Sequence, residues 1–553
     1  MQEDEKHAAA ASREEKGKSR APAELDEEEA EEPPREDKET GATTNATKRK
    51  KKLLMITTGT RGDVQPFLAL ALELQKEDKW DVAIATHGCF ASFVEEHTAG
   101  TVRLYPLEGD PGAILHSDQF VKAAYEGGMM DMANILLEET KKVAEINYRL
   151  SWAAADDYRP DLILASAVSI SEGLAIAQKL RRPLVIGASI PLYPSREYAL
   201  VTVRAKPFSV GVFNLMLHWL VFKTGWALTG GPMINKFRKE LELPPQKSYH
   251  MDAAPMLCFY SEEVAPRAHD WPEFVRVTGY WTIRPSSDQQ LPEEVEDFLS
   301  AGAPPVYMGF GSMPLKDARA TATQFVAALE RLGMRGILCS GWSKEGFHEA
   351  TQGHPHVLLV KDVPHELLFP RCSIAIHHGG AGTTAASLRA GIPTIIFPFF
   401  GDQPFWAHRL AELGVGPPEV VPLKEMTQES LEAQIVATAS DDIKHKAARL
   451  GEVLRSEEED GVRVAAKWLD MYSRETRTAP SSDQPEPHMR WVPDEECQGC
   501  AKAFGLLLNR RHHCRVCGGI FCASCLTQQR LLNYPFNQPQ LVCGPCTPHQ
   551  LAV

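Results

Sequence analysis

The sequence predicts an α/β protein with two Rossmann-like domains that face each other across a cleft, plus a small zinc-stabilised module. Apolar, strand-like runs alternate with helical patterns from Leu53 onward, and the alternation occurs twice along the chain. Eight of the 12 cysteines crowd between Cys497 and Cys546 as four CxxC pairs, which predicts the zinc module.

Composition divides the chain into five segments. Residues 1–52 are rich in Glu, Lys, Ala and Pro with almost no large apolar side chain, so disorder is expected. Rossmann-like domains are expected over residues 53–248 and 249–472. A flexible linker over residues 473–489 and the zinc module over residues 490–550 follow. The basic run Lys48–Lys52 fits a solvated charge run, a nuclear signal or a membrane-steering patch.

The first domain is expected to be doubly wound, with ligands at the carboxyl ends of its strands. Its predicted strands are Leu53–Thr58, Asp81–Thr86, Val102–Leu107, Asp161–Ala165 and Pro183–Ala188. Helices are predicted over Gln65–Lys76 and Glu172–Leu180, and a longer helical region fills residues 120–158.

The second domain repeats the alternation without clear sequence identity to the first. Its predicted strands are Val306–Phe310, Gly336–Cys339, Val357–Val360, Ser373–Ile376 and Thr394–Phe399. A long helical pattern over residues 427–475 follows, and its end is expected to cross back and brace the first domain.

Charge and hydropathy exclude several classes of protein. The net charge of -14 argues against a general nucleic-acid binder. No apolar signal region opens the sequence, so a cytoplasmic location is expected. The longest apolar stretch, Phe208–Phe222, is interrupted by Asn214 and His218. A membrane span needs about 18 or more apolar residues, so this stretch is interpreted as a buried or interfacial helix.

The strongest local pattern lies in residues 373–403. A glycine loop containing Gly380 and Gly382 follows the predicted strand, and a helix with Thr383 as its expected N-cap comes next. Bare backbone N–H groups and the positive end of the helix dipole favour an anion at such a junction. The pattern therefore predicts a diphosphate site.

Polar side chains at the same sheet edge extend this site. His378 can donate a further hydrogen bond to the diphosphate, and the next strand delivers Asp402 and Gln403. A carboxylate and an amide suit a polyol, and a diphosphate joined to a polyol describes a nucleotide-sugar.

Two further places near this edge are open to two interpretations each. Gly311 and Ser312 end a predicted strand and either touch the phosphates or form a simple turn. Trp342 follows another strand and either packs near the nucleotide base or is structural.

Asp63 lies in the loop GTRGDVQP, which joins the first strand to the first helix at the carboxyl edge of the sheet. It is the one candidate general base in that loop. A carboxylate in this position also caps helices, and the residues alone support both roles equally.

Residues 53–470 resemble the GT-B glycosyltransferases, specifically the sterol 3-beta-glucosyltransferase branch. The resemblance is carried by TTGTRGDVQPFLALALEL, MGFGSM, CSGW, DVPHELLFPR, HHGGAGTTAASLRAGIPTIIFPFFGDQPFWA and GVGPP. It implies a GT-B fold and inverting transfer of glucose from UDP-glucose to the 3-hydroxyl of a sterol, with no catalytic metal.

The resemblance also implies roles for residues. Asp63 occupies the place of the family's proposed base, and Asp402 and Gln403 resemble its sugar-contacting pair. Relatives with a plant-type signature place Trp where this chain has Asp362. The full expected donor-binding set is Gly62, Gly311, Ser312, Trp342, Val363, His365, His378, Gly380, Gly382, Thr383, Asp402 and Gln403.

The cysteine spacings predict two structural zinc ions, since each takes four ligands. In a core this small, zinc must supply much of the folding energy. Interleaved pairing is expected: Cys497, Cys500, Cys522 and Cys525 on one ion, and Cys514, Cys517, Cys543 and Cys546 on the other.

The module resembles a FYVE domain, which binds phosphatidylinositol 3-phosphate. The resemblance rests on the sequence WVPD at residues 491–494 and RRHHCR at residues 510–515, and LLL at residues 506–508 resembles the membrane-inserting loop. Leu541 departs from the family, which has Arg there, and implies weaker lipid affinity. The expected phosphoinositide-binding residues are Trp491, Asp494, Arg510, Arg511, His512, His513 and Arg515.

Together these features predict a peripheral membrane enzyme at endosomal or autophagic membranes. One alternative is a glycosyltransferase that acts on another lipid or on a small apolar alcohol. Another is a phosphoinositide-binding adaptor with dead transferase domains, against which the intact loop around Asp63 and the intact HHGGAGTT block argue.

Overall fold

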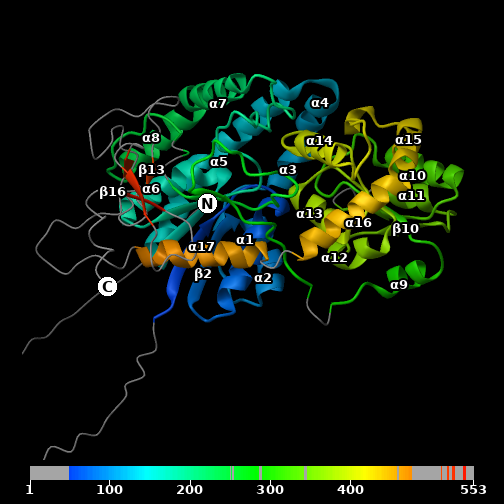
Figure 1. Ribbon diagram of the computed structural model, residues 1–553, viewed down its shortest axis with the longest axis horizontal. Helices are drawn as coiled ribbons and strands as arrows, with labels where there is room; N and C mark the ends of the chain where they lie inside the picture. The colour runs from blue at the N-terminus through cyan, green and yellow to red at the C-terminus, as the bar shows by residue number, and fades with distance from the viewer. Residues whose placement is uncertain are drawn as a thin grey trace, which may run out of the picture. The chain divides into compact units, whose positions relative to one another are not determined.

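The computed structural model describes residues 49–249, 251, 254–285, 289–341, 346–456 and 460–475, and four short strands between residues 512 and 543. Two parallel sheets covered by helices dominate this part of the chain, as the sequence predicts (Figure 1). Residues 342–345, which include Trp342, lie outside it.

The first sheet is seven-stranded and parallel, in the order β3-β2-β1-β4-β5-β6-β7. Its central strands are apolar on both faces because helices cover both, and Leu53, Leu54 and Met55 are fully buried. The strands are β1 (Lys51–Ile56), β2 (Trp80–His87), β3 (Arg103–Leu107), β4 (Leu162–Ser166), β5 (Leu184–Ala188), β6 (Met256–Cys258) and β7 (Val275–Val277).

Eight α-helices accompany this sheet in the described residues. They are α1 (Arg61–Gln75), α2 (Ala91–Thr98), α3 (Pro111–Leu115), α4 (Asp118–Glu126), α5 (Met129–Tyr158), α6 (Ile170–Leu180), α7 (Gly211–Gly225) and α8 (Gly231–Glu240). The short turns η1 (Gly88–Phe90), η2 (Ala167–Ser169) and the π-helical η3 (Trp226–Gly230) lie between them.

The second sheet is five-stranded and parallel, in the order β10-β9-β8-β11-β12. Its strands are β8 (Val306–Gly309), β9 (Gly336–Cys339), β10 (Val357–Val360), β11 (Ile374–His377) and β12 (Thr394–Ile396). Its helices and turns are α9 (Glu293–Ser300), α10 (Ala318–Leu332), α11 (Phe347–Thr351), α12 (His365–Leu368), η4 (Phe369–Arg371), α13 (Ala381–Ala390), α14 (Gln403–Leu413), η5 (Leu423–Glu425), α15 (Gln428–Thr438), α16 (Asp441–Ser456) and α17 (Gly461–Glu475).

Several boundaries differ from those expected. β6 and β7 belong to the first sheet, although residues 249–472 were expected to form the second domain. β1 begins at Lys51, inside the segment expected to be disordered, because the Lys52 backbone N–H donates to Asp161 (3.0 Å) and the strand pairs with β2 from its first residue.

Helices cross between the two domains. The end of the chain's second domain, α17, packs against α1 of the first domain (Figure 1), as the sequence predicts, with Trp468 and Leu469 buried in the first domain's core. In the opposite direction, α4 inserts Phe120 into the core of the second domain, where its ring meets Phe400 edge-on. Apolar burial of this kind is the main force that holds such elements together.

The zinc module is described only through β13 (His512–His513), β14 (Ile520–Phe521), β15 (Leu526–Gln529) and β16 (Gln540–Cys543), which form two antiparallel pairs. The side chains of these strands and the other expected zinc and phosphoinositide ligands lie outside the described residues. Within the described residues, no helix has the length and apolar character needed to cross a membrane. The same residues contain no cluster of three or more metal-ligating side chains.

Candidate active site

Asp63 is partly buried at the third position of α1, at the carboxyl end of β1. Its carboxylate oxygen Oδ2 accepts a hydrogen bond from the Thr60 backbone N–H (2.7 Å) and one from the Thr60 hydroxyl (3.2 Å). The helix therefore begins at Arg61, before the expected start at Gln65, because the N–H of Thr60 finds its partner in this carboxylate. Asp63 therefore caps helix α1.

Burial raises the pKa of Asp63 to about 6, against the hydrogen bonds from Thr60, and the nearby Asp402 carboxylate raises it further. A general base works best with a pKa near the working pH. The interaction with Asp402 also shows that the first and second domains bring two carboxyl groups together at this point. The structure therefore places a carboxyl group with a raised pKa where the two domains meet.

Gly59 makes room for this carboxylate. Its φ of +123° is a conformation that L-residues rarely adopt, and an added Cβ would lie 2.3 Å from Asp63 Oδ2. The turn from β1 into α1 therefore requires glycine at this position.

The predicted anion site is formed by β11, the glycine loop and α13. The helix is preceded by Gly380, not by the expected N-cap Thr383, which lies in the first turn. Gly380 supplies no side-chain cap, so the first backbone N–H groups of α13 are available to a ligand. A Cβ at Gly382 would meet nothing within 4 Å. The helix thus presents an open amino end, as a diphosphate requires.

His378 lies beside this open end. A Cβ at Gly380 would lie 2.7 Å from His378 Nε2, and a Cβ at Gly311 would lie 3.3 Å from the ring carbon Cε1. The two expected glycines thus flank the ring. Burial and the nearby His365 lower the pKa of His378 to about 4, so the ring is neutral at pH 7. Its Nδ1 atom is buried without a hydrogen-bond partner, which suits a ligand contact.

Ser312 follows the turn at Gly311 and links the domains. Its carbonyl oxygen lies 3.2 Å from His116 Nε2, at the end of α3 in the first domain. The residue therefore has a structural contact in addition to any role toward phosphate.

Val363 and His365, both in the expected donor-binding set, have different environments. Val363 is buried in the core of the second domain, and its backbone N–H donates to the Asp362 side chain (3.0 Å). His365 lies 2.9 Å from the Tyr307 hydroxyl through Nε2 and stacks on Phe369 at 4.5 Å between ring centroids. Burial lowers the pKa of His365 to about 4.

Asp402 and Gln403 are held by partners within their own domain. Gln403 Oε1 accepts hydrogen bonds from the Phe399 and Phe400 backbone N–H groups (2.7 and 3.2 Å), so its oxygen supports the turn before α14. Asp402 Oδ2 accepts a bond from Trp406 Nε1 (2.7 Å). Burial raises the pKa of Asp402.

Sequence reasoning missed two contacts. The Asp402–Trp406 pair has the i, i+4 spacing of helical neighbours, and that spacing was the available signal. Arg61, beside Asp63, donates to Asp362 across the two domains (3.1 Å), and no local pattern indicates such a long-range pair.

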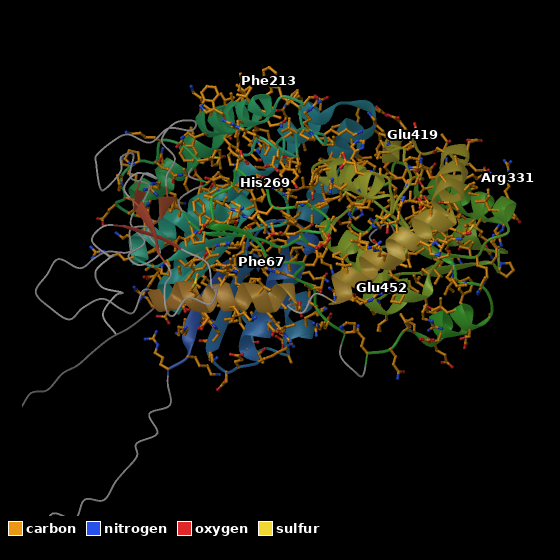
Figure 2. All side chains as sticks on the ribbon, in the orientation of Figure 1. Phe67, Phe213, His269, Arg331, Glu419 and Glu452 are labelled. Atoms are coloured by element: carbon orange, nitrogen blue, oxygen red, sulfur yellow. The ribbon has the colours of Figure 1, made fainter. Side chains whose placement is uncertain are left out.

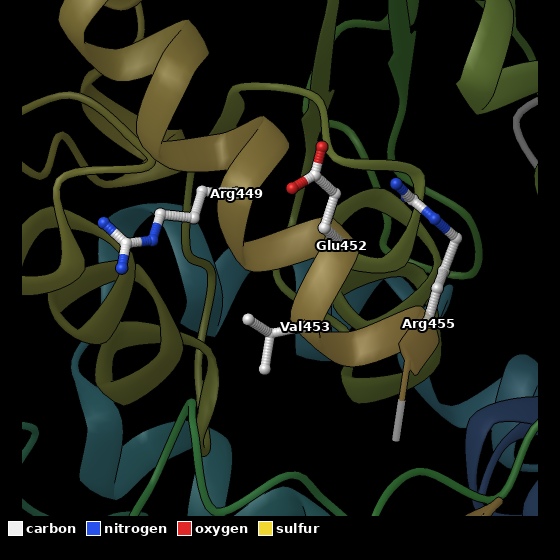
Figure 3. A pocket seen from close by; sticks show the side chains of 4 residues that line it. All are labelled: Arg449, Glu452, Val453 and Arg455. Carbon is white, nitrogen blue, oxygen red and sulfur yellow. The ribbon is translucent and has the colours of Figure 1, made fainter. Parts of the chain in front are cut away.

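The apolar stretch Phe208–Phe222, expected to be a buried or interfacial helix, has exposed apolar side chains and buries Asn214 and His218. Val168, at the carboxyl end of β4, is 72% exposed and is a better candidate for contact with an apolar acceptor. The hollow in Figure 3, lined by Arg449, Glu452, Val453 and Arg455 of α16, contains none of the expected site residues.

Known protein families match both sheets and the zinc module. The glycosyltransferase family 28 N-terminal domain matches residues 53–181, and the C-terminal domain of erythromycin biosynthesis protein CIII-like proteins matches residues 346–458. The FYVE zinc finger matches residues 490–551. Solved glycosyltransferases share the fold: that of kitacinnamycin has a TM-score of 0.54 at 20% identity, covering 77% of this chain and 99% of its own. VinC, solved in complex with DTDP, has a TM-score of 0.55 at 15% identity, covering 76% and 99%.

The fold and the matching families define a GT-B glycosyltransferase with a FYVE zinc finger. The sterol 3-beta-glucosyltransferase UGT80B1 of Arabidopsis thaliana is 34% identical over 84% of this chain and 74% of its own length. UGT80A2 of the same plant is 32% identical over 81% and 69%. The chain belongs to the sterol 3-beta-glucosyltransferase family.

Other relatives are much longer than this chain. It covers 30% of the UDP-sugar-dependent glycosyltransferase 52 of Dictyostelium discoideum, at 29% identity over 89% of this chain.

Proposed function

We propose that this glycosyltransferase transfers glucose from UDP-glucose to the 3-hydroxyl of a membrane sterol, with inversion at the anomeric carbon. The observation that carries the proposal is Asp63, a partly buried carboxyl group whose pKa is raised to about 6 by desolvation and by Asp402 of the donor-side domain. The names of the Arabidopsis relatives support the sterol and the glucose.

In the proposed reaction, Asp63 removes the proton from the acceptor hydroxyl while that oxygen attacks the anomeric carbon. The new bond joins the acceptor oxygen to the sugar, and the bond from the sugar to the diphosphate breaks. General-base assistance of this kind is typically worth about 10²–10⁴ in rate.

The leaving diphosphate carries the electron pair and needs charge stabilisation. The open amino end of α13 supplies backbone N–H groups and the positive end of the helix dipole. The neutral His378 ring adds one donor without adding net charge. The other proposed donor contacts are Gly62, Gly311, Ser312, Trp342, Val363, His365, Gly380, Gly382, Thr383, Asp402 and Gln403.

The FYVE match supports recruitment to membranes that carry phosphatidylinositol 3-phosphate, at endosomal or autophagic sites. Eight thiolates in four CxxC pairs fit two tetrahedral zinc sites, which would hold this module folded. Arg510, Arg511 and Arg515 suit a phosphorylated headgroup because guanidinium groups bind phosphate in a bidentate manner. If the Arg511→Ala variant binds phosphoinositide liposomes as tightly as the unmodified chain does, the proposed recruitment is wrong.

The reaction is tested by UDP release from UDP-glucose by the full chain, with and without a sterol dispersed in detergent. We expect sterol-dependent release that Asp63→Asn abolishes. Release that requires a different lipid or a small apolar alcohol would reassign the acceptor. No release under any condition, alongside firm binding to liposomes, would identify a phosphoinositide-binding adaptor.

A further inference from the structure

Helix α7 has its polar side chains inside and its apolar side chains outside. Asn214 and His218 are fully buried, whereas their apolar neighbours face solvent. The exposed fractions are 40% for Val212, 48% for Phe213, 56% for Met216, 45% for Trp219 and 53% for Leu220. These five residues are called the α7 apolar face below. Figure 1 places α7 at the outer edge of the first domain, and Figure 2 shows Phe213 there.

Specific hydrogen bonds fix this orientation. The Asn214 side chain donates to the Arg196 carbonyl oxygen (2.7 Å) and accepts from the Phe208 backbone N–H (2.8 Å). His218 Nδ1 lies 2.9 Å from the Asn214 carbonyl oxygen, one helical turn earlier. Rotating α7 to bury its apolar face would leave these buried polar groups without partners, which is costly. The outward apolar face is therefore built into the fold.

The charged side chains within the segment that carries the α7 apolar face have one sign. Between Tyr198 and Asn235 the sequence contains three cationic side chains, Arg204, Lys206 and Lys223, and no Asp or Glu, in a chain of net charge -14. The guanidinium of Arg204 lies over the Phe208 ring at 4.1 Å, and the ammonium of Lys223 lies over the Trp219 ring at 4.4 Å. Cations whose stems cover apolar rings, with a tryptophan among them, are typical of a lipid-water interface.

The length of α7 sets how it meets a membrane. Its 15 residues span about 22 Å, which is less than the roughly 30 Å hydrocarbon core of a bilayer. Because Asn214 and His218 hold its inner side on the first domain, α7 can meet a membrane only along its outward side, parallel to the surface. Leu228 in η3, just past the helix end, is also exposed (77%).

We propose that the α7 apolar face docks on a lipid surface with anionic headgroups, independently of the zinc finger. The occupant is a bilayer because the face combines apolar side chains with the cations Arg204, Lys206 and Lys223 of its own segment, which matches acyl chains and acidic headgroups together. The docking rests on α7 alone. Its consequence for catalysis rests on the proposed function: the loop from Ile190 to Val210 leaves the carboxyl edge of β5, the edge that carries Asp63, and joins it to α7.

The test measures binding of the full chain to vesicles of phosphatidylcholine and phosphatidylserine that contain no phosphoinositide. Arg511→Ala is present throughout, so that the proposed phosphoinositide site is silent. We expect this chain to float with the vesicles, and Phe213→Glu or Leu220→Glu to lower the partition coefficient roughly tenfold or more. Val436→Glu, at an equally exposed apolar residue of α15 (59%), is the matched control and should change nothing.

Two further measurements keep the test decisive. Both glutamate variants replace side chains about half exposed, so thermal melting should match the parent chain. Should either variant fail to fold, amide hydrogen exchange over residues 211–225 of the unmodified chain should slow when vesicles are added. UDP release with detergent-dispersed sterol should be unchanged in the variants, while release with vesicle-embedded sterol should fall.

Three results would overturn the docking. The first is that the Arg511→Ala chain does not bind phosphoinositide-free vesicles. The second is that the glutamate variants bind these vesicles as tightly as their parent chain. The third is self-association that Phe213→Glu abolishes without any vesicle binding, which would assign the face to a contact between copies. Vesicle binding with no UDP release would instead contradict the proposed function and leave the docking intact.

Discussion

Asp63 caps helix α1 and, in the proposed mechanism, also acts as the base. Both hydrogen bonds from Thr60 reach the same carboxylate oxygen, Oδ2, and start helix α1. The proposed mechanism leaves the other oxygen, Oδ1, to accept the proton. The capping and catalytic interpretations of the sequence are therefore compatible, because a cap that fixes the carboxylate also aims it.

The first prediction concerns Asp63→Asn. The amide oxygen can still accept the Thr60 N–H bond, so the variant should fold normally, while loss of the base should lower kcat by about 10²–10⁴. Removing a buried ionisable group should leave the melting temperature unchanged or raised. UDP release and thermal melting measure both effects, and undiminished turnover would show that Asp63 is not the base.

The second prediction concerns pH. Because the pKa of Asp63 is about 6, kcat/KM should fall below pH 6, about tenfold per pH unit, as the base becomes protonated. The Asp402 carboxylate contributes to this raised value, so Asp402→Asn should move the acidic limb to lower pH. An acidic limb that stays in place in Asp402→Asn would contradict the coupling, and one that persists in Asp63→Asn would assign it to another group.

The same shift has a consequence for stability with the opposite sign. The folded-state pKa lies above the ordinary value of 3.8, so the folded protein favours protonated Asp63. Its contribution to the free energy of unfolding is therefore most favourable below pH 3.8 and is lost as the pH rises through about 6. Above pH 6, where the proposed base is ionised and active, Asp63 is therefore expected to lower the free energy of unfolding.

At the scale of elements, the parallel strands were predictable because continuous apolar runs between helices have few other structures available. β9 and β10 have the expected bounds. The three-residue strands β6 and β7 carry too short a pattern to detect, and the early start of α1 depends on the hydrogen bond from the Thr60 N–H to Asp63, which forms only in the folded chain.

Some features of the candidate site were also predictable from the sequence, and others were not. The sequence pointed to Asp63, His378 and the open amino end of α13, because each sits at a strand–loop–helix junction where ligands bind. It did not indicate the Arg61–Asp362 ion pair or the use of the Gln403 oxygen by the Phe399–Phe400 turn, because these depend on contacts made by folding.

The third prediction concerns the turn between β1 and α1. Gly59→Ala should nearly abolish activity, because the new methyl group would displace the Asp63 carboxylate that it meets at 2.3 Å. Gly353→Ala is the matched control, since Gly353 also has a positive φ (+85°) but a Cβ there would meet nothing within 4 Å. Both should lose about 1–2 kcal/mol from backbone strain. Equal activity in the two variants would show that the close approach at Gly59 does not matter.

At the scale of the whole molecule, apolar contacts rather than ion pairs hold the two domains together. The Arg61–Asp362 pair is exposed on both sides (43% and 67%), and exposed pairs of this kind are worth about 0–1 kcal/mol. Phe120 of α4 and Trp468 of α17 are buried in the core of the domain opposite to their own. Because each domain completes the other's core, neither is expected to fold well alone.

The fourth prediction follows from this exchange and concerns Trp468. Its ring is 4% exposed, stacks on Tyr472 at 5.7 Å and lies under the Arg276 guanidinium at 4.8 Å. Trp468→Ala should cost about 3–5 kcal/mol, since truncating a buried tryptophan leaves a cavity. The loss should appear in the first domain, where urea should speed amide exchange in α1 before it does so in α13. Lys467→Ala, at the neighbouring exposed position of α17, is the control and should lose far less stability. Faster exchange in α13 alone would show that α17 braces its own domain instead.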